Sequence, residues 1–282
     1  MYRAAIETGK EYLTSQIKDG LCQEFHQLRH GPSLAWPTAC IGSTLSEFHA
    51  VPKEMLEAVL ELRWDCGGWS YNQKAAPDAD TTLRVIQLFQ KVGFADAQIM
   101  ASAEDFVIAH QQTDGGIATF LPEYLTAMGY PAGGWTISHP CVTALATNIL
   151  HQGPAQRRAN KYIAERIARG DLRTYWSRRP WYVLYEAGRL KQVPVSTDVA
   201  ELSLVLLLKA KLRMPDQTLL AGLARLQLAD GSFPSSSLFR IPRPQQLLEN
   251  LTGDEEIVRD ERRIFSTAAA IVAIARQEAL LN

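Results

Sequence analysis

The stretch AHQQTDGGI, residues 109–117, decides the fold because its pattern recurs along the chain. It contains the end of a helix, then Gln111, two further residues and Asp-Gly. Related segments are TSQIKDGL (14–21) and ARLQLADGSF (224–233), with decayed copies in LRWDCGGW (62–69) and ERIARGDL (165–172). The landmark positions 16, 63, 111, 166 and 227 leave room for two helices and their turns in each interval. Self-similarity at such a period predicts a repeat architecture.

Two kinds of helical segment alternate around these landmarks. Those before the landmarks are 2–16, 52–64, 96–112, 155–168 and 215–228; the first and third have the mixed faces typical of an outer wall. Those after the landmarks are rich in apolar, small and hydroxyl residues, which predicts burial: 38–48, 78–89, 140–150, 181–190 and 265–275. We therefore expect an all-α fold of about five to six helical hairpins in two concentric rings, as one domain over residues 1–282.

The repeat has local details and one irregularity. In each turn, glycine supplies the positive φ that ends one helix, and aspartate is a candidate cap for the next. The stretch STDVAELSLVLLLKAKL, residues 196–212, is an additional apolar helix without a turn motif of its own. Residues 233–254, rich in Pro and Ser, form a long loop that we expect over one mouth of the ring. Sustained period-2 alternation is absent, so little β structure is expected.

Composition excludes several classes of function. The net charge is −1, so no strong field attracts nucleic acid or an anionic membrane surface. The amphipathic, charged N-terminus is unlike a secretory signal, and the apolar run LSLVLLLKAKL is interrupted by lysine too early to span a bilayer. The four scattered cysteines are typical of reduced thiols in a chain of this size. These features predict a soluble, cytoplasmic protein without a transmembrane segment.

Some of these segments resemble a known family. QQTDGG and LQLADGSF resemble the QW motif of the squalene-hopene and oxidosqualene cyclases, and PDADTTLRVIQLF (77–89) resembles the Asp-x-Asp-Asp-Thr motif of class II terpene cyclases. The resemblance implies an (α/α) toroid with a central cavity. Protein prenyltransferases and lanthionine cyclases share that fold, so the fold alone does not determine the chemistry.

The resemblance implies roles for individual residues. Asp78 corresponds to the first aspartate of the motif and Asp80 to the second, which in the family donates the proton. Thr81 stands where hopene cyclases have a third aspartate, and Thr82 matches the following threonine. The implied activity is carbocation cyclisation of a prenyl or polyprenyl substrate, started by protonation from Asp80 with help from Asp78. His139 begins another inner helix and is a candidate hydrogen-bond partner of the acid.

Two interpretations of the aspartates remain open at this stage. Burial and a neighbouring carboxylate raise a carboxyl pKa, so an Asp78/Asp80 pair in an apolar cavity provides an acid. The start of a helix lowers a carboxyl pKa and favours capping residues, so Asp80 is alternatively an N-cap, and Asp78 is favoured as a cap or a helper of the acid.

A carbocation is stabilised by the faces of aromatic rings, each by about 0.5–2 kcal/mol. We expect the cavity wall, and with it the substrate-binding residues, to include Trp36, Trp69, Thr82, Trp176, Trp181, Tyr182 and Tyr185. Ordinary core packing is the alternative for each ring. Arg178, Arg179, Arg240 and Arg243 are candidates to bind a diphosphate near the mouth, and the first two lie beside the aromatic cluster.

The remaining expectations concern cofactors, partners and competing functions. The predicted chemistry needs no redox cofactor, with Mg²⁺ required only for a diphosphate substrate, and the sequence predicts no metal site. A partner chain or a second copy is a candidate to close the cavity of a lone toroid. The main alternative is a non-catalytic toroid that binds a hydrophobic ligand or a protein. A zinc-dependent toroid enzyme fits less well, because the sequence lacks ligands at zinc-compatible spacing.

Overall fold

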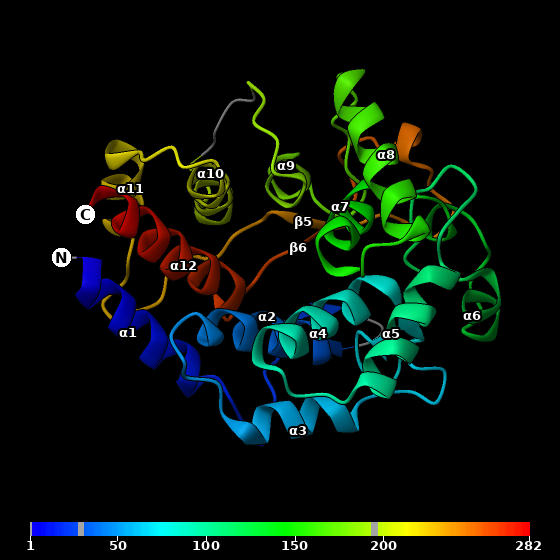
Figure 1. Cartoon of the computed structure of the whole chain (residues 1–282), viewed down its shortest axis with the longest axis horizontal. Helices are drawn as coiled ribbons and strands as arrows, with labels where there is room; N and C mark the ends of the chain where they lie inside the picture. The colour runs from blue at the N-terminus through cyan, green and yellow to red at the C-terminus, as the bar shows by residue number, and fades with distance from the viewer. Residues whose placement is uncertain (1, 28–30, 193–196) are drawn as a thin grey trace.

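Six helices form the inner ring of the computed structural model, which describes residues 2–27, 31–192 and 197–282 (Figure 1). They are α2 (Ala35–Ser46), α4 (Ala79–Val92), α7 (Pro140–Ile149), α9 (Trp181–Ala187), α10 (Val199–Lys211) and α12 (Ile264–Leu281). Each packs against the next in this order, and α12 packs back against α2. The ring is therefore closed by contact between the last inner helix and the first.

Five helices form the outer wall: α1 (Tyr2–Ser15), α3 (Lys53–Glu61), α5 (Ala97–Ala109), α8 (Pro154–Ala168) and α11 (Gln217–Ala224). Helix α1 covers α12, α3 covers α2, α5 covers α4 and α8 covers α7, while α11 packs against both α10 and α12. The described residues between α9 and α10 form no outer helix, which accounts for the irregular repeat. The prediction of an all-α fold in two concentric rings is confirmed. The additional helix expected at 196–212 is α10, although Ser196 lies outside the described residues.

The recurring geometry of the repeat turn comes from the glutamine and the glycine. The Gln111 side-chain amide donates to the Gly115 carbonyl of its own turn and to the Ala155 carbonyl of the next outer helix, both at 2.9 Å. Gly115 has a φ of +89°, and a Cβ there would lie 2.7 Å from the Arg158 carbonyl oxygen. Gln227 makes the same two kinds of bond, to its turn and to α1. In these two copies the motif joins one outer helix to the next.

The aspartate of the motif does not cap the following helix, contrary to the expectation from sequence. Asp114 accepts a hydrogen bond from the Gly116 N–H at 2.9 Å, inside its own turn. Inner helices α4 and α10 are instead capped by Asp78 and Asp198, which lie outside the motif. A two-residue bond within the turn forms more readily than a cap across it, because Asp-Gly already favours the local turn.

Short strands complete the molecule in three antiparallel hairpins. They are β1 (Glu24–Gln27) with β2 (Gly31–Ser33), β3 (Trp69–Ser70) with β4 (Pro77–Asp78), and β5 (Phe239–Ile241) with β6 (Glu256–Val258). The expectation of little β structure is confirmed, and these strands of two to four residues are too short to show period-2 alternation in the sequence. In hairpin β5–β6, strand β5 lies within the loop expected over one mouth, and strand β6 follows that loop. In projection the hairpin crosses the centre of the ring (Figure 1). The remaining short helices are α6 (Pro122–Ala127), η1 (Gly134–Thr136) and η2 (Leu248–Asn250).

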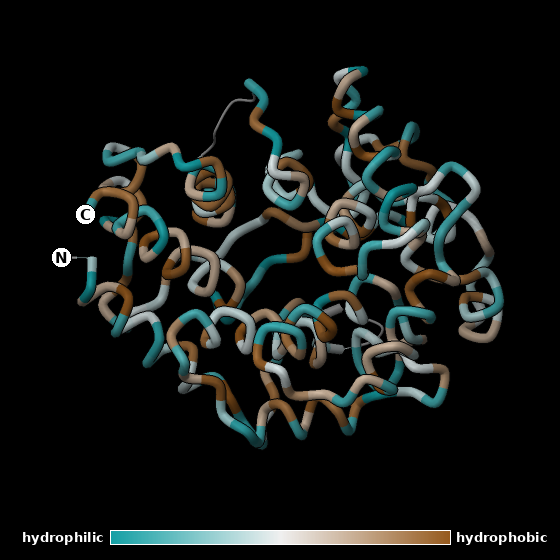
Figure 2. The backbone as a smooth tube through the Cα atoms, in the orientation of Figure 1, coloured by the Kyte–Doolittle hydropathy of each residue, from teal (hydrophilic) through white to brown (hydrophobic). Residues whose placement is uncertain are grey.

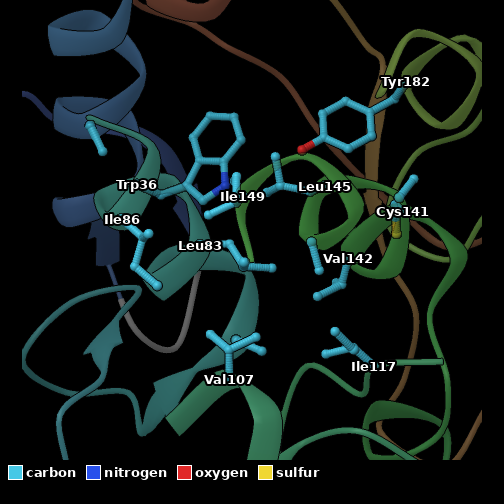
Figure 3. Close-up of a cluster of buried hydrophobic side chains, with 14 of the residues drawn as sticks. Trp36, Leu83, Ile86, Val107, Ile117, Cys141, Val142, Leu145, Ile149 and Tyr182 are labelled. Carbon is cyan, nitrogen blue, oxygen red and sulfur yellow. The ribbon is translucent and has the colours of Figure 1, made fainter. Parts of the chain in front are cut away.

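Apolar packing holds the two rings together. Figure 3 shows the contact between α4 and α7, where Leu83 and Ile86 lie opposite Val142, Leu145 and Ile149, all buried. In Figure 2, α10 and α12 carry mostly apolar colours. Helix α12 is long and apolar enough to cross a membrane by length and composition, but 61% of that window is buried against its neighbours. It is a core helix of the ring.

Candidate active site

The inner helices run in the same direction, and their N-terminal ends meet at one cavity. Trp36, Asp80, Cys141 and Tyr182 all line it, and each is the second residue of its helix, α2, α4, α7 and α9. The empty space, counting the open mouth, is about 970 Å³. Figure 3 shows Trp36 and Tyr182 pointing towards the centre of the ring from opposite sides. The repeat thus delivers equivalent positions of successive helices to one place.

Aromatic rings dominate the rest of the wall. The hairpins supply Phe25 and Phe239, whose rings meet Trp36 edge-on at centroid distances of 5.5 and 5.9 Å. Trp135 and Trp176 face the cavity from the segments before α7 and α9, 5.6 Å apart. The other lining residues are Ser33, Tyr71, Ala75, Asp78, Thr81, Thr119, Phe120, Met128, Arg240, Ile241 and Val258. The hairpins β1–β2 and β5–β6 therefore line the mouth of the cavity, and strand β5 belongs to the long loop that was expected there.

Asp80 presents its carboxyl group to this cavity. Its Oδ2 accepts a hydrogen bond from the indole N–H of Trp36 at 3.0 Å. Burial raises the pKa of Asp80, while the charge of Arg84 and the Trp36 hydrogen bond act in the opposite direction; the net shift is upward. The dipole of α4 also favours the ionised form, so burial outweighs the helix terminus.

Asp78 has the capping role. Its Oδ1 accepts from the Thr81 N–H at 2.7 Å, and its Oδ2 accepts from the Thr81 hydroxyl at 2.8 Å. Burial, with the nearby Asp80 charge, raises its pKa to about 7. The Thr82 hydroxyl donates to the Asp78 carbonyl and accepts from the Trp69 N–H, so it supports the helix start and does not line the cavity. Of the two roles considered for the aspartates, Asp78 therefore has the capping role at α4, and the Asp80 carboxyl group faces the cavity.

His139 does not contact Asp80, contrary to the expectation. Its Nε2 bonds with the Gly134 carbonyl and its Nδ1 with the Thr119 hydroxyl, both at 2.7 Å. Because a carbonyl only accepts, Nε2 carries the proton and Nδ1 accepts from Thr119. Burial lowers the pKa of His139 to about 3, so the ring is neutral. The same Thr119 hydroxyl accepts from the Trp176 indole N–H at 2.7 Å, which fixes the orientation of that cavity ring.

Several residues that were expected to bind the substrate do not line the cavity. Trp69 is fully buried behind α4, and its indole donates to the Val59 carbonyl at 2.7 Å, because it belongs to the decayed repeat turn. Trp181 is buried in the ring beside the cavity residue Tyr182, but does not line the cavity. Arg178 bonds to Ser237 on the surface.

Arg179 and Tyr185 also lie away from the cavity. Arg179 is exposed and lies 3.8 Å from Glu201. Tyr185 is one turn further along α9 than Tyr182, so it faces the opposite end of the ring. Arg178 and Arg179 therefore line no part of the cavity, whereas Arg240, another of the arginines expected to bind a diphosphate, does line it.

The sequence did not single out Phe25, Phe120 or Phe239 as cavity residues. Phe25 and Phe239 belong to strands too short to recognise, and only the position of Phe239 in the long loop hinted at a place over the mouth. Phe120 follows the turn of residues 109–117 and stacks on Trp135 with centroids 5.6 Å apart.

The C-terminal ends of the inner helices surround a second, more polar pocket. There Glu47 accepts from Lys91 at 2.8 Å and from Arg276 at 2.9 Å. Arg84 and Tyr182 lie between this pocket and the first cavity, and Arg84 binds Glu186 at 3.1 Å. Within the described residues, no three His, Cys, Asp or Glu side chains are grouped as metal ligands. All four cysteines are unpaired.

Comparison with known proteins gives matches in structure but not in sequence. No protein-family model and no curated protein sequence matches the chain. A protein from Actinoplanes superposes with a TM-score of 0.84 at 21% identity, over 99% of this chain and 100% of that one. The type II terpene cyclase MstE from Scytonema superposes with a TM-score of 0.80 at 21% identity, over 99% of both chains. The fold is that of the class II terpene cyclases.

In a larger protein of this fold class, the region that matches this chain is only part of the protein's length. The ent-copalyl diphosphate synthase from Streptomyces platensis matches 86% of this chain with a TM-score of 0.53 and 14% identity, and the match covers 50% of the synthase. The class II cyclase fold is thus present here as one ring of helices, as in the full-length match with MstE. Structures of MstE variants contain geranylgeranyl dihydroxybenzoate as substrate and merosterolic acid A as product.

Proposed function

We propose that this chain is a class II terpene cyclase in which Asp80 protonates a carbon–carbon double bond of a polyprenyl substrate. The observation that carries the proposal is the placement of Asp80 in an aromatic cavity, with its partner Asp78 committed to capping α4. An exposed Asp80 would have favoured a binding protein without catalysis. Instead, the carboxyl group lies inside the ring, where burial raises its pKa.

The chemistry follows from the groups around Asp80. The acid O–H adds its proton to one alkene carbon, and the π electrons of the chain then close rings through successive carbocations. Loss of a proton from the last cation forms the final double bond. The Asp80 carboxylate left behind accepts the Trp36 indole N–H, and such a bond strengthens as negative charge develops on the oxygen. Trp36 therefore stabilises the conjugate base in the transition state.

The aromatic wall is suited to the cationic intermediates. Phe25, Trp36, Trp176 and Phe239 offer ring faces and edges around one apolar space. A cation near an aromatic face gains about 0.5–2 kcal/mol per ring without meeting a nucleophile that would trap it. The hairpins β1–β2 and β5–β6 place apolar side chains at the mouth, where they limit the access of water that this chemistry must avoid.

The charges of the cavity favour a substrate without a diphosphate. Among the described lining residues, Arg240 is the basic side chain, and it is paired with Glu255 at 3.2 Å and with the carbonyls of Thr174 and Tyr175. A diphosphate buried without cations would carry a large desolvation cost. We therefore propose a polyprenyl chain with an uncharged or singly charged head group, acting without Mg²⁺. The geranylgeranyl dihydroxybenzoate substrate named for MstE is consistent with this class.

The experiment is incubation of the purified protein with geranylgeranyl diphosphate, squalene, and geranylgeranyl phenols or benzoates. Products are identified by mass spectrometry, with Asp80→Asn as the inactive control and EDTA present in a parallel set. Cyclic products from a substrate without a diphosphate, insensitive to EDTA and absent in Asp80→Asn, are expected. A lack of cyclic product from every substrate, or full activity of Asp80→Asn, would refute the proposed function.

A further inference from the structure

A buried ion pair lies directly beneath the acid. Arg84 is on α4, one helical turn after Asp80, and its guanidinium donates to Glu186 of α9 at 3.1 Å and to the Tyr182 hydroxyl. Both members of the pair are nearly inaccessible, with 9% and 4% of their surfaces exposed. Glu186 is fixed in turn by Asn148 of α7, whose side-chain amide donates to it at 3.1 Å. Three inner helices are thus joined below the cavity.

Arg84 is also placed to reach Asp80. On its own helix Arg84 also donates to the Gln87 side chain at 2.8 Å. Side chains four residues apart on a helix are neighbours, so Asp80 is the carboxyl group of α4 that Arg84 can reach. The guanidinium lies 5.5 Å from the centre of the Trp36 ring, and the N–H of that same indole binds Asp80. A buried arginine that loses its counter-ion is strongly destabilised and will pair with any carboxylate within reach. An Asp80 paired with Arg84 would be ionised and unable to donate a proton.

We infer that Glu186 is a positioning residue for catalysis, because it holds Arg84 in an ion pair and so leaves Asp80 free to carry the proton. This inference rests on the proposed role of Asp80 as the acid. Glu186 acts through Arg84 and does not touch the substrate. Its negative charge also raises the pKa of Asp80, whereas the charge of Arg84 lowers it, so removing Glu186 changes both effects in the same direction.

Other groups near Asp80 and near the ion pair are unsuited to this role. Asp78 is committed to capping, and the Cys141 thiol has a pKa raised by burial to about 11, so it stays neutral. Burial raises the pKa of Tyr182 and of Cys40. Lys211 donates to the backbone carbonyl of Glu186 at 3.0 Å and to the Asn148 side chain at 3.5 Å rather than to the Glu186 carboxylate. Glu186 is therefore the carboxylate that compensates Arg84.

The test compares Glu186→Gln with the double variant R84Q/E186Q. The active form of Asp80 is protonated, so activity is present below its pKa and is lost as the pH rises through it. In Glu186→Gln the alkaline limb of the kcat profile moves to lower pH. If the Asp80 pKa falls by about one, the rate on the alkaline side falls roughly tenfold. In the double variant the charge of Arg84 is also gone, and the limb returns to the wild-type position or above it.

Glu47→Gln is the matched control for these variants. Glu47 also binds two cations, but it faces the far pocket and has no contact with the Asp80 cavity. Its replacement should leave the alkaline limb at the wild-type position. A limb that moves equally in Glu47→Gln and Glu186→Gln would contradict a specific role for Glu186.

A second readout separates this inference from the proposed function. The infrared band of a protonated carboxyl group, assigned by its loss in Asp80→Asn, reports the titration of Asp80 without any substrate. A lower Asp80 pKa in Glu186→Gln, restored in the double variant, is expected even if no substrate is cyclised. An unchanged Asp80 pKa in Glu186→Gln, or a double variant that titrates as low as the single one, would overturn the inference. If Glu186→Gln does not fold, the double variant decides, because an Asp80 pKa below that of the wild type would contradict it.

Discussion

The two ends of the inner ring are formed by the same helices but shift the pKa of a carboxyl group in opposite directions. At the N-terminal ends, Trp36, Asp80 and Tyr182 face an aromatic cavity, and burial raises the pKa of the acid. At the C-terminal ends, Lys91 and Arg276 surround Glu47; although burial opposes it, these two cations lower the pKa of Glu47.

The difference shows how parallel packing distributes charge. Six parallel helices bring their positive dipole ends to one mouth and their negative ends to the other, so cations suit the second pocket. At the first mouth the dipoles favour a carboxylate, and only burial in an apolar cavity can keep an acid protonated there. The contrast is therefore between an end where desolvation controls the carboxyl groups and an end where paired charges do.

The largest expected effect separates the two aspartates of the N-terminal end. Asp80→Asn should reduce kcat by roughly 10²–10⁴-fold, the usual contribution of a general acid. Asp78→Asn keeps an oxygen that accepts from the Thr81 N–H, so it should retain folding and activity within about tenfold. The comparison measures the product formed by the two variants, and circular dichroism checks that both are folded. Equal loss in both would show that the motif acts as an inseparable pair.

The next effect concerns the indole that binds the acid. Trp36→Phe keeps an aromatic ring but removes the N–H that Asp80 accepts. Hydrogen bonds to charged groups are worth about 1.5–3 kcal/mol, so kcat should fall by roughly 10–100-fold. Because the lost bond favours the ionised acid, the alkaline limb should move to higher pH. A pH–rate profile measures both the fall in kcat and the direction in which the alkaline limb moves. An alkaline limb that moves to lower pH would argue against this role of Trp36.

A smaller effect distinguishes the two ends by the pH dependence of stability. Burial raises the pKa of Glu24 to about 7 and of Asp260 to about 6, and both lie at the N-terminal end, where they accept from backbone N–H groups near the start of α12. In the unfolded chain these groups ionise at lower pH, so between about pH 5 and 7 the folded state binds more protons. Stability should therefore fall as pH rises through this window, by on the order of 1–3 kcal/mol. Thermal unfolding from pH 5 to 8 measures it, and Glu24→Gln should flatten the dependence.

The smallest effect is expected at the C-terminal end. Lys91→Met and Arg276→Met each remove one partner of Glu47, and all three side chains are partly exposed to solvent, between 27% and 35%. Such pairs contribute about 0–1 kcal/mol, so unfolding should change little and cyclisation should stay within about twofold. Thermal melts and product assays of both variants measure this. A large loss of activity would give the second pocket a part in catalysis.

Sequence alone predicted the ring because its information is local and repeated. Gln111 and Gly115 act within one turn and on the next helix, so their spacing reveals the architecture. The motif also located Asp78 and Asp80, but not their division of roles, since that depends on which carboxyl meets Thr81 and which meets the cavity. Trp69 was misassigned as a cavity residue because repeat turns and cavities both favour tryptophan.

The sequence could not predict which distant residues join Asp80 at the site, for a different reason. Phe25 and Phe239 come from hairpins whose place over the mouth is set by long-range packing, which leaves no periodic trace. Arg84 and Glu186 are 102 residues apart in sequence, and their pairing requires the closed ring. Likewise, His139 begins an inner helix as expected, but its ring reaches Gly134 and Thr119 rather than the acid.

Closure of the ring through α1, α11 and α12 has a consequence for the order of folding. Tyr12 donates to the Arg262 carbonyl at 2.7 Å, and Gln227 donates to the Ala5 carbonyl at 2.8 Å, so the seam joins segments more than 200 residues apart. A growing chain leaves one flank of α2 uncovered until residues 264–281 have been made and have docked. The cavity is thus among the last features to form, and a nascent chain has an apolar edge to protect for most of its synthesis.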